Sequence, residues 1–126
     1  MYLKLCDLLY YFEDAFENKA TFLSIVDYQI YSEEEKLILV NKEIYQREDF
    51  LLIPKKDFQE IVVKYLIKKN NSKLLREKES KDFYKKFHWY IEDNLLVEEW
   101  KYFEKTELIY FASAWCEQNQ IKFTVK

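Results

Sequence analysis

A single long helix is predicted by residues 97–118, which read VEEWKYFEKTELIYFASAWCEQ. At about 100° per residue, its apolar side chains fall into two stripes on opposite sides. A helix that is apolar on both sides is expected at the centre of a core. One stripe holds Trp100, Phe103, Phe111 and Ala114 with Trp115 alongside, and the other holds Ile109, Ala112 and Cys116.

Shorter helical patterns precede this segment. Their apolar residues recur every three or four positions, and side chains that accept hydrogen bonds stand where helices begin. The predicted helices are one over about 57–69, capped by Asp57 with Glu60, a short one from Ser72 to about 78, and one over about 81–93, in which Tyr84, Phe87 and Ile91 share a face.

The N-terminal half mixes helix and strand signals. Residues 3–17 carry apolar side chains at helical spacing, whereas residues 21–31 are rich in β-branched and aromatic residues. Asp27 is the best turn residue within the second stretch, which therefore predicts a short β-hairpin. Short strands are also expected at residues 50–53, ahead of Pro54, and in the tail at residues 121–125.

Residues 33–46 leave two interpretations open. Ser32 and Glu35 form the Ser-x-x-Glu pattern of a capping box, which favours a helix. A strand over residues 37–40 is the competitor. Together the patterns predict one α+β domain over residues 1–126, mainly helical, with a small antiparallel sheet and a long central C-terminal helix.

The aromatic segment resembles the C-terminal half of a bacterial uncharacterised protein family, number 0158 of the UPF series. The resemblance covers about residues 80–123 and implies a fold and a bacterial source, but no activity. Ser80 and Asp82 stand where that family has a Gly-x-Gly element. The matching residues are Tyr84 and Phe87, Trp100 and Phe103, and then Ala112, Trp115, Cys116, Asn119 and Ile121.

Composition excludes several functional classes. The chain has no glycine, so it contains no dinucleotide fingerprint, P-loop or Gly-x-Ser-x-Gly elbow. The longest uncharged run in the aromatic helix, residues 108–116, is far short of a membrane span, and no signal-peptide pattern is present. We therefore expect a cytoplasmic protein, in which Cys6 and Cys116 are free, buried thiols.

A basic block stands out in this otherwise acidic chain, whose net charge is −3. Residues 64–86 contain nine Lys or Arg and three acidic residues. Trp89 follows on the side of its helix opposite Phe87 and Ile91, where it is either exposed beside the lysines or covered by another element. Such a block attracts an anionic partner, although a solvated lysine-rich face is the alternative. The candidate binding residues are Lys64, Lys68, Lys73, Arg76, Lys81, Lys85, Lys86 and Trp89.

Two further residues are candidates for chemistry. Glu107 falls within the apolar face between Phe103 and Phe111, where a carboxylate is paired with a Tyr or Lys, held at a raised pKa, or placed at an interface. His88 is the only histidine and has no visible catalytic partner. One histidine and two scattered cysteines lack the spacing of a zinc site, so neither a metal nor a cofactor is expected.

These patterns support a small binding or regulatory protein without catalysis, whose partner is another protein with an acidic surface. Nucleic-acid binding through residues 64–86 is the first alternative, and an enzyme using Glu107 or His88 is the second. The sequence names neither the partner nor the oligomeric state.

Overall fold

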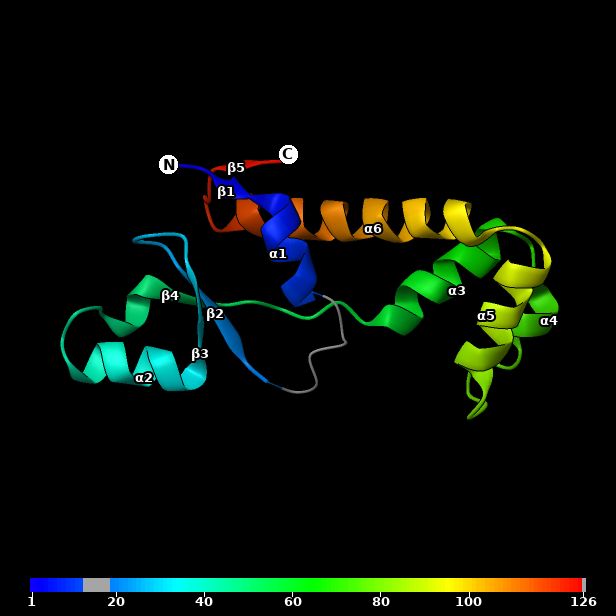
Figure 1. Ribbon diagram of the computed structural model, residues 1–126, viewed down its shortest axis with the longest axis horizontal. Helices are drawn as coiled ribbons and strands as arrows, with labels where there is room; N and C mark the ends of the chain where they lie inside the picture. The colour runs from blue at the N-terminus through cyan, green and yellow to red at the C-terminus, as the bar shows by residue number, and fades with distance from the viewer. Residues whose placement is uncertain (13–18, 126) are drawn as a thin grey trace. The chain divides into compact units, whose positions relative to one another are not determined.

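The computed structural model describes residues 1–12 and 19–125, and it confirms a mainly helical α+β fold with a small antiparallel sheet and a long C-terminal helix (Figure 1). The described residues form two compact units. The first unit comprises residues 1–56 and 109–126, and the second comprises residues 57–108. Each is described by itself below.

The first unit contains a three-stranded antiparallel sheet. Its order is β3 (Ile30–Ser32), β2 (Thr21–Ser24), β4 (Phe50–Leu52), with Phe22 opposite both Tyr31 and Leu52. The predicted hairpin is thus confirmed. The buried Ser24 hydroxyl accepts a hydrogen bond from the backbone N–H of Val26 at 3.1 Å. The Asp27 carboxylate accepts one from the N–H of Gln29 at 2.9 Å. These side-chain bonds hold the tight turn in place of glycine.

Asp27 also ties the hairpin to a later segment. Its carboxylate accepts hydrogen bonds from the hydroxyls of Tyr31 at 2.6 Å and Tyr45 at 2.7 Å. The rings of Tyr31, Tyr45 and Phe50 pack edge to face, with centroids 5.7 to 6.2 Å apart. A carboxylate that accepts this many bonds is stabilised in its charged form. We call Asp27, Tyr31 and Tyr45 the tyrosine–aspartate cluster.

The structure shows a helix at residues 33–41, where the sequence left both a helix and a strand open. Helix α2 (Glu33–Asn41) begins with the predicted capping box, in which Ser32 Oγ accepts from Glu35 N–H at 3.1 Å and Glu35 accepts from Ser32 N–H at 2.9 Å. It ends five residues before the predicted boundary at 46, and residues 47–49 form a single 3-10 turn. None of the α2 side chains is buried.

Helix α1 (Leu5–Phe12) begins two residues later than predicted, because Leu3 and Lys4 form strand β1. That strand pairs in parallel with β5 (Phe123–Thr124), so the expected tail strand exists, although it covers only two residues. The predicted helix residues 13–17 lie outside the described residues. Phe12 packs against Phe111 and Trp115 at ring distances of 5.2 and 5.7 Å.

The second unit is built from helices. They are α3 (Phe58–Lys68), α4 (Ser72–Leu75), α5 (Phe83–Asp93) and residues 97–108 of α6 (Val97–Gln118), whose bounds match the predicted ones. Asp57 caps α3 as predicted. Asn71, and not Ser72, caps α4 by accepting from the Leu74 N–H at 3.1 Å, and α4 ends before residue 78.

Its core is an aromatic cluster. The Trp100 ring lies 4.8 Å from Phe87 and 5.3 Å from Tyr65, both of which are fully buried. Phe58 and Phe103 complete the surroundings of Trp100 at 5.9 and 6.3 Å. Edge-to-face and stacked aromatic pairs of this kind add to the stabilisation from burial.

Two of the predicted apolar faces need correction. Phe83 occupies the buried position that Tyr84 was expected to take, and Tyr84 is 40% exposed. In α6 buried residues lie on both sides of the helix, as predicted, because Trp100 and Cys116 are about 160° apart at 100° per residue. The buried residues are Trp100, Leu108, Ala112 and Cys116, whereas Ala114, which was expected in the same stripe as Trp100, is exposed.

Because the chain has no glycine, other residues take the left-handed positions at the helix ends. Helices α2, α3, α5 and α6 each end in a Schellman motif, whose left-handed residue is normally glycine. Here the position is taken by Glu43, Asn70, Leu95 and Gln120, with φ between 56° and 59°.

Leu95→Gly should therefore raise the free energy of unfolding by up to about 1 kcal/mol. A side chain in the left-handed region costs about 1 to 2 kcal/mol, and the extra freedom of glycine in the unfolded chain offsets part of that gain. Little packing is lost, since Leu95 is 92% exposed. Urea denaturation measures the change. Asn70→Gly is the matched control and should gain less, because asparagine tolerates this conformation. A less stable Leu95→Gly protein would contradict the prediction.

Candidate functional site

The basic block forms the surface of α3, α4, α5 and the turn at residues 76–82. This turn is anchored from within the unit, because Gln59 Nε2 donates to the carbonyl of Lys78 at 3.1 Å. Leu74 is buried, and α4 contacts both α3 and α5. The block is therefore held on ordered elements.

Three of its lysines are engaged in ion pairs. Lys64 Nζ lies 2.9 Å from Glu107 Oε2, and Lys69 pairs with Glu99. Lys86 lies 3.0 Å from Glu77 and 3.7 Å from Asp82. These contacts balance part of the positive charge that the sequence places in the block, so Lys64 and Lys86 have roles inside the unit.

The carboxylates of the turn respond to these contacts. The hydrogen bond from the Ser80 hydroxyl, aided by the charge of Lys86, lowers the pKa of Asp82. The hydrogen bond to Glu77 and the nearby Asp82 raise the pKa of Lys86. Both groups are thereby held in their charged forms.

Other lysines of the block lie over aromatic rings. The Lys68 ammonium is 5.4 Å from the centroid of Phe103, and that of Lys69 is 5.8 Å from Tyr65. Long lysine side chains commonly cover apolar surface while the charge stays in water. Lys68 is thus both a part of the basic surface and a cover for the aromatic cluster.

The remaining cations of the block face solvent. Lys73, Arg76, Lys78 and Lys81 are exposed, and none of them makes a side-chain ion pair within the described parts of the chain. They come from α4 and the turn that precedes α5. Trp89 extends this surface along α5, where it is 51% exposed and the Lys85 ammonium lies 5.1 Å from its ring. The sequence left open whether another element covers Trp89, and the structure shows the side chain half exposed beside a lysine. We call Lys73, Arg76, Lys78, Lys81, Lys85 and Trp89 the tryptophan–lysine surface.

Glu107 is paired, which is one of the three interpretations that the sequence left open. Its side chain is 18% exposed and accepts from Lys64 across 43 residues of sequence. A carboxylate satisfied by a lysine is an ordinary structural arrangement. His88 is exposed and lies 5.9 Å from the Phe87 ring, and no carboxylate contacts it among the described residues.

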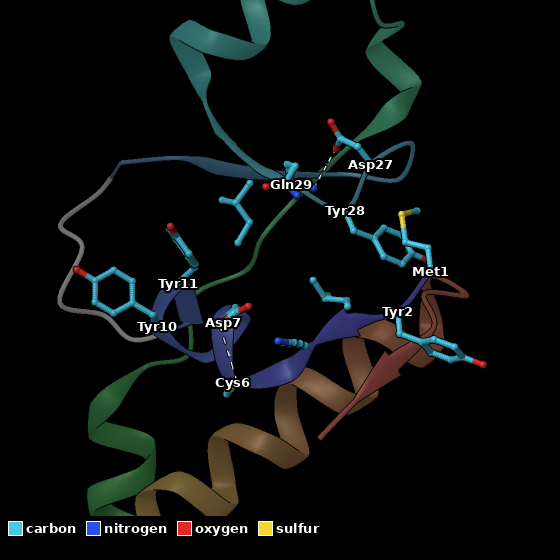
Figure 2. A pocket seen from close by; sticks show the side chains of 12 residues that line it. Met1, Tyr2, Cys6, Asp7, Tyr10, Tyr11, Asp27, Tyr28 and Gln29 are labelled. Carbon is cyan, nitrogen blue, oxygen red and sulfur yellow. Dashed lines mark hydrogen bonds between the residues drawn. The ribbon is translucent and has the colours of Figure 1, made fainter. Parts of the chain in front are cut away.

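A groove of about 880 Å³ in the first unit was not anticipated from the sequence. Figure 2 shows it between α1 and the hairpin turn, with Tyr11 rising from the helix and Tyr28 descending from the turn. Its charged side chains are Lys4, Asp7 and Asp27. The Asp7 carboxylate contacts only the Cys6 thiol, at 3.9 Å, among the described side chains. A groove of this size admits a small molecule, but its walls hold no converging set of polar groups that identifies one.

The cysteines are free, as expected, but only Cys116 is buried, and burial raises its pKa to about 11. Cys6 is exposed on α1, which corrects the prediction that both thiols are buried. In residues 1–12 and 19–125, no three His, Cys, Asp or Glu side chains gather in a way that would hold a metal ion.

No protein-family model, curated protein or solved structure matches this chain. The resemblance of residues 80–123 to the uncharacterised bacterial family therefore stays a prediction. None of the described helices is both long enough and apolar enough to span a membrane.

Proposed function

We propose that this protein is a non-catalytic binding module that recognises an acidic protein through the tryptophan–lysine surface. The observation that carries the proposal is the half-exposed ring of Trp89 on α5, with a lysine ammonium 5.1 Å from its centroid. Tryptophan is the residue type most enriched among those that dominate binding energy at protein interfaces.

The charge of the tryptophan–lysine surface indicates the kind of partner. Three exposed cations make no ion pair with any described residue: Lys73, Arg76 and Lys81. They are therefore available to bind carboxylates of a partner. Complementary charge around an apolar anchor raises association rates and selects partners. The matching surface has an apolar pocket for Trp89 with Asp or Glu side chains around it.

Nucleic-acid binding is the second candidate, favoured by the same exposed cations and by the capacity of an exposed indole ring to stack on a base. The net charge of −3 works against it, because most of the molecule repels a phosphate backbone. The salt dependence of binding distinguishes the two candidate functions, because affinity for a nucleic acid falls steeply as the salt concentration rises.

Trp89→Ala should weaken partner binding by roughly thirtyfold, the equivalent of about 2 kcal/mol for an interface anchor. Charge reversal of Lys73, Arg76 and Lys81 to Glu should abolish capture. The test is affinity capture from lysate with and without nuclease, followed by titration of the purified partner. Tyr102→Ala, at a residue 76% exposed in the same unit, is the control for Trp89. Replacement of the exposed Lys101 and Lys105 by Glu is the control for the triple charge reversal.

A captured protein that survives nuclease and is lost with both variants, but not with the controls, supports the proposal. Nucleic acid that co-purifies and dissociates near roughly 0.5 M salt supports the second candidate instead. Capture that is equal for wild type and both variants overturns both, because it removes the surface from the interaction.

A further inference from the structure

Helix α2 has an outer face that no described residue of its own unit covers. Its inner side chains lie against the sheet, where the Lys36 ammonium is 4.2 Å from the centroid of the Phe22 ring. Leu37 and Ile38 point elsewhere and are 50% and 52% exposed. Figure 1 shows the strands along one side of α2 and no described element of this unit along the other.

This arrangement is unfavourable for an isolated helix. A nine-residue helix is marginal in water by itself and depends on burying an apolar face. Here no side chain of α2 is buried, and adjacent leucine and isoleucine side chains are half in solvent. Burying these two apolar side chains against another surface would be favourable.

The charges along the outer face identify what covers it. Residues 34, 37, 38, 41 and 42 recur at helical spacing and are all exposed. Glu34 lies four residues before Ile38, and Lys42 lies four residues after it, at the helix C-terminus. The face is therefore acidic at one end, apolar in the middle and basic at the other end.

We propose that α2 pairs antiparallel with α2 of a second copy of this chain, about a two-fold axis through Ile38. In that arrangement each Ile38 meets its own copy, and each Glu34 meets Lys42 of the other copy about 6 Å along the axis from the centre. The helix dipoles then run in opposite directions, which is favourable. A two-fold contact needs a surface that is complementary to itself, and this sequence of charges meets that condition.

The contact is small. One short helix on each side buries less than the roughly 1,200 Å² of a stable interface, so the dimer is weak and forms as protein concentration rises. The surface is separate from the tryptophan–lysine surface of the second unit. Self-association therefore stands or falls independently of the proposed binding of an acidic protein.

Sedimentation equilibrium from micromolar to millimolar protein tests the proposal. The expected apparent mass rises from 15.7 kDa towards twice that value. Ile38→Lys places two like charges on the two-fold axis and should raise the dimer dissociation constant by about tenfold or more. Ile67→Lys is the control, since Ile67 is 59% exposed on α3, and it should leave dimerisation unchanged.

A charge swap examines the two-fold geometry directly. Glu34→Lys alone should weaken the dimer, and adding Lys42→Glu should restore it, because each ion pair is reformed with its charges exchanged. Far-UV circular dichroism verifies that each variant is folded. A protein that stays monomeric at millimolar concentration overturns the proposal. So does a dimer that is insensitive to Ile38→Lys or is not restored by the second substitution.

Discussion

Trp100→Ala should lower the free energy of unfolding by about 3 to 5 kcal/mol, the largest effect we expect from any single substitution. The Trp100 side chain is 5% exposed and sits among four aromatic rings from α3, α5 and α6. Its removal leaves a cavity that rigid neighbouring rings cannot close. Urea denaturation followed by far-UV circular dichroism measures the loss.

Tyr65→Phe is the matched control in the same cluster. The Tyr65 hydroxyl is buried without a hydrogen-bond partner among the described residues, and burial raises its pKa to about 12. Removing an unsatisfied hydroxyl while keeping the ring should leave stability unchanged or raise it by about 1 kcal/mol. If Trp100→Ala costs no more than Tyr65→Phe, the cluster is not the core of the second unit.

Asp27→Asn should lower the free energy of unfolding by about 1 to 3 kcal/mol at neutral pH, because hydrogen bonds to a charged acceptor are stronger than those to an amide. Although partial burial opposes ionisation, the bonds from Tyr31, the Gln29 N–H and Tyr45 lower the pKa of Asp27. Thermal unfolding between pH 2 and pH 8 (about the span over which carboxylates titrate) compares the variant with wild type.

The lowered pKa of Asp27 determines how the stability of the fold depends on pH. Because the pKa of Asp27 is lower in the folded state, its stabilisation is complete above about pH 4, the unfolded value, and is lost as pH falls further. The hydrogen bond to Asp27 raises the pKa of Tyr31 and that of Tyr45. Their contribution is therefore present below about pH 10 and is lost above it. A difference between Asp27→Asn and wild type that persists unchanged at pH 2 would contradict this account.

Local signals in the sequence were sufficient for most element types. The capping box at Ser32, the cap at Asp57 and the hairpin around Asp27 were all predicted, because each depends on residues within a few positions of one another. The bounds of the long C-terminal helix were predicted for the same reason. The left-handed conformation of Leu95 was not, because no glycine marks it.

The candidate surface was predicted in part. Charge counting located the basic block, and the helical wheel placed Trp89 away from the apolar face, where the structure has it. The sequence did not show which of these cations form ion pairs and which are unpaired. Lys64 and Glu107 are 43 residues apart in sequence and 2.9 Å apart in space. A contact of this kind depends on how helices pack, and local periodicity carries no information about it.

The sequence by itself therefore determined the fold class, the helix caps and the exclusion of glycine-dependent phosphate sites, since each follows from short-range sterics and hydrogen bonding. Only the tertiary structure decided that Phe83 and not Tyr84 is buried, that Tyr45 completes the site around Asp27, and that Leu37 and Ile38 of α2 are half exposed. These features depend on which elements lie against one another, and burial and pairing are properties of that packing rather than of any one segment.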